Sequence, residues 1–285
     1  MESGKTAAGG FFGSKTPTTG RKGKDMLLVL DVGNTTVVLG VFDGDRLVRQ
    51  WRLTSDRRTS DEIGMILLSL MRSAGIEPAL IHGAILGSVV PPLDSVIVEA
   101  IDIYFHSPCL RVDTSLDLGI EVRYATPKEI GADRLINAVA GKSKYGHPVI
   151  VVDFGTAITL DVVSPDGAYL GGTISPGIVT SMEALFGRTA KLPKIALEIP
   201  SVAIGRTTVE AIQSGILFGT AGLVDALVRR IERELGCRVT VVATGGHCSL
   251  VASASETIGH VDPELTLDGL RMIYERNSGS VARPR

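Results

Sequence analysis

One pattern occurs twice in this chain and constrains its fold more than any other feature. In each copy an apolar strand ends in Asp-x-Gly followed by Asn or Thr, and two further strands follow, separated by an Asp-Gly turn. The first copy covers residues 26–53 and the second covers residues 149–171. Their leading aspartates, Asp31 and Asp153, are separated by about half of the ordered chain. The repeat therefore predicts an α/β protein with two similar domains that face each other across a cleft.

Helical periodicity follows each copy. In the first half we predict, in order, a helix from its N-cap Ser60 to Gly75, a strand over residues 84–90 and a helix from Pro91-Pro92. A strand-helix-strand-helix order is typical of parallel pairing. In the second half we predict a helix over residues 208–235, a strand over 239–243 and a helix over 265–276.

The domain boundary is predicted near Gly146. It divides the chain into an N-terminal domain over residues 26–146 and a C-terminal domain over residues 147–285. Residues 1–25 are predicted to be a disordered leader, because this Gly-, Thr-, Ser- and Lys-rich stretch holds too little apolar surface to offset its chain entropy. The leader does not resemble a secretory signal, because no apolar stretch of sufficient length follows its positive residues.

Composition argues against several classes of function. The 29 Lys and Arg against 31 Asp and Glu give a net charge of −2, which provides no basic field for nucleic acid or a membrane surface. The 3 cysteines are an odd number without close pairing, so a reducing, cytoplasmic compartment is expected. The 5 histidines lack the spacing of a zinc site. We find no apolar run of about 18 uncharged residues, so no membrane span is expected.

The two Asp-x-Gly turns carry chemistry suited to phosphate. Such a turn exposes backbone N–H groups and a hydroxyl to phosphate oxygens, while the aspartate can hold a cation. Asp and Gly also build tight turns without any ligand, as we expect for Asp43-Gly44. Because both copies follow matching strands, the repeat favours phosphate binding over turn formation alone. Dinucleotide-binding and P-loop glycine patterns are absent; position 136, where a P-loop needs glycine, is Ile136.

Gly131-Ala-Asp-Arg134 begins a predicted helix. An aspartate here is favourable simply because of the helix dipole. Alternatively, Asp133 is a base and Arg134, beside it, binds the carboxylate or phosphate of a substrate. The open approach at Gly131 and Ala132 favours this second interpretation.

Together these segments resemble the type III pantothenate kinases. The resemblance extends from about Met26 to Asn277 and rests on six motifs in the family's order: Asp31-Val-Gly-Asn-Thr-Thr, Gly131-Ala-Asp-Arg134, Asp153-Phe-Gly-Thr156, Gly171-Gly-Thr-Ile-Ser-Pro-Gly177, Thr207-Thr208 with Gln213-Ser-Gly-Ile-Leu-Phe-Gly219, and Thr244-Gly-Gly246. The family often has Asn-Thr where this chain has Thr207-Thr208.

The resemblance implies a fold of the actin, sugar kinase and Hsp70 type, with ribonuclease H-like domains. The implied activity is an ATP-dependent transferase that phosphorylates pantothenate to 4'-phosphopantothenate, the first step of coenzyme A biosynthesis. ATP contacts are implied for Asp31, Val32, Gly33, Asn34, Thr35, Thr36, Val37, Val38 and Thr156. Pantothenate contacts are implied for Tyr124, Gly131, Ala132, Asp133, Arg134 and Thr208.

The resemblance also implies roles for three carboxylates. Asp133 would be the catalytic base, Asp31 would lie near the Mg²⁺ that accompanies ATP, and Asp153 would bind a monovalent cation, K⁺ or NH₄⁺. It further implies a homodimer whose contact completes the pantothenate pocket.

Two other functions stay open on the residues alone. One is a kinase or phosphatase of the same superfamily that acts on a sugar or an acetate-like acid. The other is a nucleotide-binding regulatory protein without catalysis, although such a binder would not need all three carboxylates.

Overall fold

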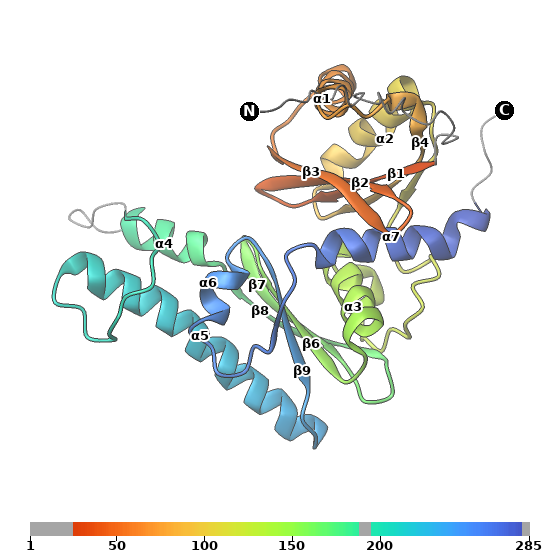
Figure 1. Cartoon of the computed structure of the whole chain (residues 1–285). Helices are drawn as coiled ribbons and strands as arrows, with labels where there is room; N and C mark the ends of the chain where they lie inside the picture. The colour runs from red at the N-terminus through yellow and green to blue at the C-terminus, as the bar shows by residue number, and fades with distance from the viewer. Residues whose placement is uncertain (1–24, 188–194, 281–285) are drawn as a thin grey trace, which may run out of the picture.

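Short runs rich in Val, Ile and Leu form the strands of two five-stranded sheets. Val and Ile, which are branched at Cβ, favour strands. The structure, a computed structural model, describes residues 25–187 and 195–280 (Figure 1). The predicted leader therefore falls, except for Asp25, outside the described residues.

The first sheet has the order β3-β2-β1-β4-β5 and the second has the order β8-β7-β6-β9-β10. The strands of the first are β1 (Met26–Val32), β2 (Thr36–Asp43), β3 (Arg46–Thr54), β4 (Ile81–Ser88) and β5 (Cys109–Arg111). Those of the second are β6 (Val149–Phe154), β7 (Ala157–Val163), β8 (Tyr169–Pro176), β9 (Thr240–Gly245) and β10 (His260–Val261).

Strand directions match between the sheets. In each sheet the central strand pairs antiparallel with the next strand of its meander and parallel with a strand that follows helices. The two sheets therefore share one topology, and the prediction of two similar α/β domains is confirmed. The last meander strand of the second sheet, β8, extends further than the sequence pattern indicates, because its ladder with β7 continues to Pro176.

Helices lie between and around the sheets. They are α1 (Ser60–Ser73), α2 (Pro91–Phe105), α3 (Ala132–Tyr145), α4 (Ile178–Gly187), α5 (Thr208–Leu235), α6 (Cys248–Ala252) and α7 (Leu265–Asn277). Single 3₁₀ turns occupy Pro78–Leu80, Pro127–Glu129 and Ser278–Ser280.

The N-cap of α1 is Thr59, not Ser60 as the sequence analysis predicts. The Thr59 hydroxyl accepts from the backbone N–H of Glu62 at 3.2 Å, and the Glu62 carboxylate accepts from the backbone N–H of Thr59 at 2.8 Å. This capping box requires a glutamate three residues after the cap, and only Thr59 satisfies that spacing. Gly75 lies just past the helix with a φ of +71°, the conformation that favours glycine there.

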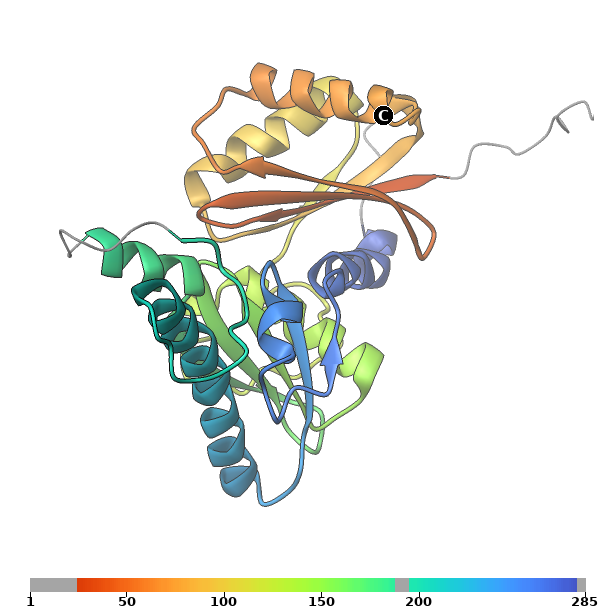
Figure 2. The same cartoon turned by 60° about the vertical axis from the view of Figure 1, so that its left-hand side comes forward.

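Two helices fill the space between the sheets. α3 packs on β6 and β7, whereas α7, at the end of the chain, packs on β1, β2 and β4 of the first sheet. The two helices also contact each other, as Figures 1 and 2 show. One core cluster therefore contains residues of both sheets, such as Val29 and Val151. α3 belongs to the predicted N-terminal domain by its position in the chain, but it packs on strands of the second sheet. The domain boundary near Gly146 therefore stays a prediction.

The outer faces are covered separately. α1 and α2 cover the first sheet, and α4, α5 and α6 cover the second (Figure 1). By length and composition alone, α5 is a candidate membrane span. Its buried face holds Leu217, Val224 and Val228, which pack on the strands of the second sheet. This packing is that of a core helix.

Candidate functional site

Asp31 and Asp153 occupy equivalent places in the two sheets. Asp31 is the next-to-last residue of β1 and lies opposite Gly87 of the parallel strand β4. Asp153 is the next-to-last residue of β6 and lies opposite Thr244 of the parallel strand β9. Both carboxylates are thus at the carboxyl ends of parallel strands, the edge at which open α/β sheets bind ligands.

The turns after these strands have closely similar hydrogen bonds. The N–H of Gly33 donates to the carbonyl of Thr36 at 3.0 Å, and the N–H of Gly155 donates to the carbonyl of Ala157 at 3.0 Å. The second turn is one residue shorter. The hydroxyl oxygens of Thr35 and Thr156 are 3.0 Å apart, so the structure brings the two predicted phosphate loops together.

The residues of the first loop differ in what they can offer a nucleotide. Asn34 and Thr35 are exposed, so their side chains and backbone are accessible. Val32 and Val37 are buried in the core beneath the outer helices, and their side chains hold the loop in place. Thr36 and Val38 are partly buried. The side chains of the two buried valines are therefore not available to phosphate.

Asp133 lies in the first turn of α3. Its Oδ1 accepts from the backbone N–H of Arg134 at 2.9 Å. Gly131 is the N-cap, and a Cβ there would lie 2.4 Å from the same oxygen. A glycine is therefore needed for the carboxylate to lie over the start of the helix. Ala132 is buried beside it.

The three carboxylates interact electrostatically. Burial raises the pKa of Asp31 to about 8, with a further increase from the negative charges of Asp153 and Asp133. Burial and Asp133 raise the pKa of Asp153 to about 6, although a hydrogen bond from Asn137 opposes the increase. Burial also raises the pKa of Asp133. Partly buried carboxylates that repel one another favour a bound cation.

This cluster suits hard cations. Carboxylate oxygens are the ligands that Mg²⁺ and similar ions prefer, and Mg²⁺ is commonly held by only one or two carboxylates together with phosphate oxygens. Within residues 25–187 and 195–280, no group of three acidic, histidine or cysteine side chains is arranged to hold a metal by itself. The residues thus fit an ion whose coordination shell is completed by nucleotide phosphates better than they fit a metal enclosed by protein ligands.

Asn137 is a site residue that the sequence analysis does not predict. It is fully buried in α3, one helical turn after Asp133, and its Nδ2 donates to Asp153 at 3.0 Å. The hydroxyl of Thr266, in α7, donates to the Asn137 Oδ1 at 2.8 Å. A polar residue at the buried i+4 position after Asp133 is the signal that would have found it.

Asp161 is a second residue missed by the sequence analysis. It lies in β7 without exposed surface, and the Nε of Arg134 donates to it at 2.7 Å. The hydroxyl of Tyr169 also donates to it, at 3.0 Å, and the ring of Tyr124 has its centroid 6.3 Å from that of Tyr169. A charge inside an otherwise apolar strand is the sequence signal for this network.

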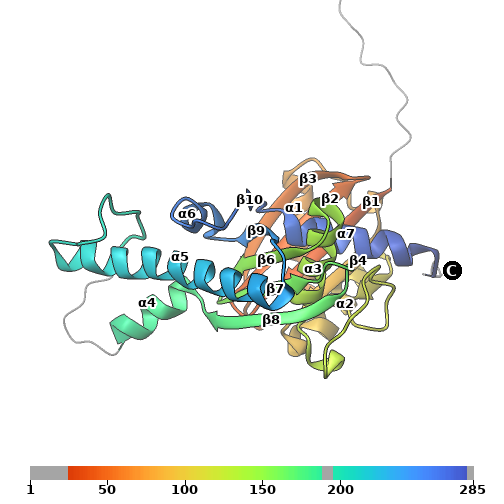
Figure 3. The same cartoon turned by 90° about the horizontal axis from the view of Figure 1, so that it is seen from below.

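Thr208 lies apart from these residues. It is the first residue of α5, and the hydroxyl of the preceding Thr207 caps that helix together with Glu210. Figures 1 and 3 show the start of α5 at the outer end of the molecule, away from α3. In the part of the chain that the structure describes, no hydrogen bond joins Thr208 to the other candidate residues. Within one chain, the structure does not bring Thr208 to the site.

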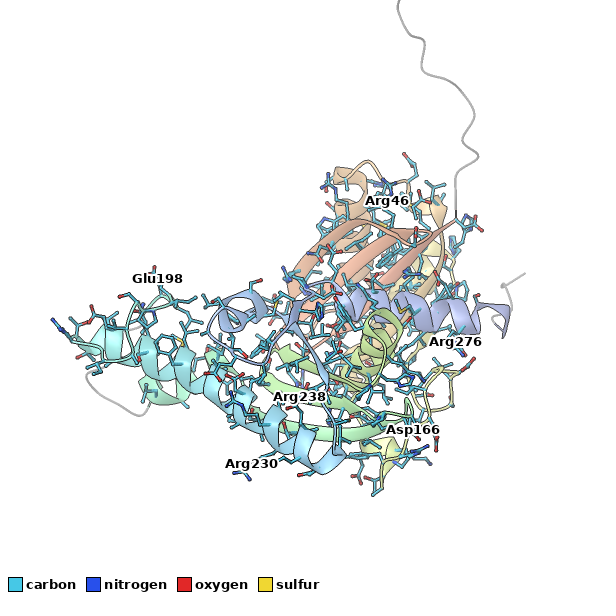
Figure 4. The ribbon with its side chains drawn as sticks, turned by 60° about the horizontal axis from the view of Figure 1, so that its bottom comes forward. Arg46, Asp166, Glu198, Arg230, Arg238 and Arg276 are labelled. Atoms are coloured by element: carbon cyan, nitrogen blue, oxygen red, sulfur yellow. The ribbon has the colours of Figure 1, made fainter. Side chains whose placement is uncertain are left out.

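A surface cavity of about 830 Å³ lies elsewhere, at the C-terminal end of α5. Arg230 and Arg238 are among its lining residues, and Figure 4 shows both at this end of the helix. Two of its arginines are already paired, Arg229 with Glu256 and Arg238 with Glu232. The residues that line this cavity include no cluster of carboxylates like that of Asp31, Asp133 and Asp153. We therefore assign the candidate site to the two loops.

Comparison with known proteins identifies close relatives. The sequence profile of the type III pantothenate kinases matches residues 27–230. A type III pantothenate kinase of Myxococcus xanthus is 49% identical over 90% of this chain and 100% of its own length. Those of Geobacter sulfurreducens and Exiguobacterium sp. are 49% and 47% identical, each over 88% of this chain and 99% of their own length.

Solved structures share the fold at low sequence identity. The activator of 2-hydroxyisocaproyl-CoA dehydratase from Clostridium difficile, solved with bound ADPNP, has a TM-score of 0.54 at 14% identity, covering 91% of this chain and 99% of its own. Component A of (R)-2-hydroxyglutaryl-CoA dehydratase from Acidaminococcus fermentans has a TM-score of 0.55 at 14% identity, covering 90% and 99%. These likenesses show that the chain, with its two sheets of equal topology, shares the fold of these two proteins.

Proposed function

The chain belongs to the type III pantothenate kinase family, and from this premise we propose how its residues carry out the reaction. Members of the family are transferases that phosphorylate pantothenate with ATP in coenzyme A biosynthesis, and this is the activity of the chain. In the reaction the pantothenate hydroxyl oxygen bonds to the γ-phosphorus of ATP, the bond from that phosphorus to the β,γ-bridging oxygen breaks, and ADP leaves. The observation that carries the residue assignment is that Asp31 and Asp153 lie at two facing turns and that Asp133, at the start of α3, interacts electrostatically with both.

The first turn, over residues 31–38, and Thr156 of the second turn hold the phosphates of ATP. Exposed N–H groups and hydroxyls at Asn34, Thr35 and Thr156 are the groups that such phosphates require. The contact between Thr35 and Thr156 supports this assignment, because it places both loops within reach of one phosphate chain. Asp31 would hold the Mg²⁺ that accompanies ATP, and the ion would supply positive charge to the phosphates.

Asp133 takes the proton from the pantothenate hydroxyl. Its raised pKa supports this role, because a more basic carboxylate is a better proton acceptor at neutral pH. The N–H of Arg134 fixes one carboxylate oxygen, which orients the group. Phosphoryl transfer depends mainly on positioning and charge neutralisation, so the base completes a reaction that the loops have already organised.

Asp153 holds a monovalent cation, K⁺ or NH₄⁺. Its side chain is only partly exposed, its pKa is raised, and its one side-chain hydrogen bond within the described residues comes from Asn137, so an ion can stabilise this carboxylate. Such an ion would add positive charge beside the phosphates without displacing the divalent metal.

Pantothenate is held by Tyr124, Arg134 and the start of α3, where Gly131 is partly exposed and Ala132 is buried. Arg134 supplies the planar donor group that a carboxylate binds. Thr208 comes from the second subunit of a homodimer, since it lies away from the site in its own chain.

An exposed apolar surface supports the dimer. It lies on β8, α4, α5 and the segment before α5, where isolated proteins rarely leave so many large apolar side chains in water. Its residues are Ile174, Val179, Leu185, Ile199, Val202, Ile204, Val209 and Leu223, with Ile204 82% exposed. We assign the dimeric enzyme to the cytoplasm.

Subunit complementation tests the dimer. Asp133→Asn and Thr208→Ala are each expected to have low activity, and mixing them should restore up to about a quarter of the wild-type rate, because half of the dimers are mixed and each holds one intact site. Light scattering reports the oligomeric state. Absence of restoration by a mixture shown to exchange subunits would contradict the assignment of Thr208.

The activity itself is tested by ADP release. Purified protein is supplied with ATP, Mg²⁺ and K⁺, with and without pantothenate, and nucleotide binding is measured in parallel. Pantothenate-dependent release is expected. Bound nucleotide without stimulation by pantothenate would instead favour a regulatory protein, and stimulation by a sugar or acetate-like acid would favour another kinase of the superfamily.

A further inference from the structure

A buried carboxylate in the second sheet has no role in the reaction described above. Asp161 lies in β7 and has no exposed surface. Its Oδ2 accepts from the hydroxyl of Thr159 at 3.0 Å, and its Oδ1 accepts from the hydroxyl of Tyr169 at 3.0 Å and from Nε of Arg134 at 2.7 Å. Burying a carboxylate is costly, and an aliphatic residue would satisfy this strand. A structural requirement of β7 alone therefore does not explain the aspartate.

Asp161 determines which edge of the Arg134 guanidinium is occupied. The bond to Asp161 uses Nε, whereas Nη2 is buried and has no hydrogen-bond partner among the described residues. Arginine cannot lose its proton in a protein, so this donor stays charged and unsatisfied until an acceptor binds. The side chain is also nearly buried, with 8% of its surface exposed, so it has little freedom to rotate.

The occupied edge matters because a guanidinium can bind carboxylates from more than one side. If the Nε edge were free, a substrate carboxylate could pair with it and the bound molecule would be turned relative to Asp133. With Nε held by Asp161, Nη2, which lies beside Nε on the same edge of the guanidinium, keeps its N–H groups for another acceptor. Tyr169 fixes the same Asp161 oxygen that accepts from Nε, which restricts the carboxylate as well.

We propose that Asp161, assisted by Tyr169, is a positioning residue for pantothenate that holds Nε of Arg134 and leaves Nη2 to bind the substrate carboxylate. The inference rests on the proposed assignment of Arg134 to pantothenate binding. It predicts that Asp161 affects recognition of the acid end of the substrate and leaves the phosphoryl-transfer step largely unchanged.

The test compares pantothenate with pantothenol, in which a hydroxymethyl group replaces the carboxylate. Asp161→Asn keeps the side-chain shape and removes its charge, and Tyr169→Phe removes one hydrogen bond. The KM for pantothenate is expected to rise about tenfold or more in Asp161→Asn and about threefold in Tyr169→Phe, because a hydrogen bond to a charged group is lost or weakened. The kcat, the KM for ATP and the inhibition constant of pantothenol as a competitor should change by less than about twofold.

Asp225→Asn is the matched control. Asp225 is also a buried aspartate, but it lies in α5 and accepts hydrogen bonds from Ser255, Glu256 and Thr257. This variant should lower the melting temperature without changing the preference for pantothenate over pantothenol. If Asp161→Asn does not fold, Tyr169→Phe tests the role by itself. A threefold rise in its KM for pantothenate, with an unchanged inhibition constant for pantothenol, would support the positioning role.

Two results would overturn the positioning role. One is an unchanged KM for pantothenate in both variants, and the other is an equal loss of affinity for pantothenate and pantothenol, which a merely structural defect produces. If the wild-type protein phosphorylates pantothenate and either result appears, only the role of Asp161 fails. If the wild-type protein shows no pantothenate-dependent ADP release, the proposed function fails and this inference falls with it.

Discussion

The two strand-turn-strand units share their backbone but not their electrostatics. Asp31 makes no side-chain hydrogen bond among the described residues and has its pKa raised to about 8, whereas Asp153 accepts from Asn137 and has a pKa of about 6. Both carboxylates are next to last in the same kind of strand and precede turns with similar hydrogen bonds. The difference has two sources: the charges of both other carboxylates raise the pKa of Asp31, and α3 presents a buried amide to the second unit only. Equivalent local structure therefore produces carboxylates with different affinities for protons and cations.

The largest expected effect is on the group that faces both units. Asp133→Asn should lower kcat by about a hundredfold or more, because an amide cannot accept the hydroxyl proton. Nucleotide affinity should change by less than about twofold, since the phosphate loops are untouched. Single-turnover kinetics and nucleotide titration separate the two quantities. A variant with near wild-type kcat would remove Asp133 from the role of base.

Next in size is the contrast between Asp31→Asn and Asp153→Asn. We expect Asp153→Asn to lose the difference between K⁺ and Na⁺, while Asp31→Asn keeps that difference and needs about 10- to 100-fold more Mg²⁺ for half-maximal rate. Steady-state rates across both ion series measure this. Thermal shift on adding K⁺ gives a second readout that does not depend on turnover. Equal rates of the wild-type enzyme in Na⁺ and K⁺ would show that Asp153 does not serve a monovalent cation.

Removing Asn137 should make the second unit resemble the first. Asn137→Leu deletes the donor to Asp153 while keeping a similar volume, so the pKa of Asp153 should rise toward that of Asp31. Half-saturation by K⁺ should then require up to about tenfold more ion. Thr266→Val is a milder companion, because it removes only the hydrogen bond that orients the amide. If neither variant alters the K⁺ dependence, the amide does not tune the second unit.

The smallest effect is on stability, and its pH dependence distinguishes the two aspartates. A carboxylate whose folded-state pKa exceeds its ordinary value of 3.8 contributes stability below that value and loses the contribution as the pH rises to the folded-state pKa. Asparagine cannot ionise and so avoids the loss. Without ligands, the melting temperature of Asp31→Asn should therefore exceed that of the wild type by at least about 2 °C, and the difference should increase with pH until about pH 8. The gain from Asp153→Asn should level off near pH 6.

Calorimetry in buffers without divalent ions or K⁺ measures both trends. A gain that does not depend on pH would point to packing and not to the charge of the carboxylate. Adding Mg²⁺ and nucleotide should reverse the advantage of Asp31→Asn, since ligands that bind only the folded state stabilise the wild type more.

Most of the fold was predictable from local patterns. The long helix over residues 208–235 and the helix from Pro91 have the predicted bounds or start, because amphipathic spacing and helix-start residues are local signals. The predicted N-cap of α1, Ser60, was wrong. Glu62 lies three residues after Thr59 and forms the capping box with that residue. The packing of α7 on the first sheet was not predicted, because it joins segments far apart in the chain.

The candidate site also contains residues that local motifs predict and residues that they do not. Asp31, Asp133 and Asp153 were visible because each lies in a short motif with glycine beside it. Asn137 and Asp161 were missed, since their partners come from other elements and no motif contains both members of a pair.

By itself the sequence determined the two repeated units, the order of strands and helices, the family and the carboxylates at the strand ends. These follow from hydrophobic periodicity, turn residues and motif order, which act over a few neighbouring residues. Tertiary structure alone decided that α3 and α7 lie between the sheets, that Thr35 meets Thr156, and that Asp153 and Arg134 acquire buried partners. It also decided how far each aspartate pKa is raised, because desolvation and charge interactions depend on distance in space and not on separation along the chain.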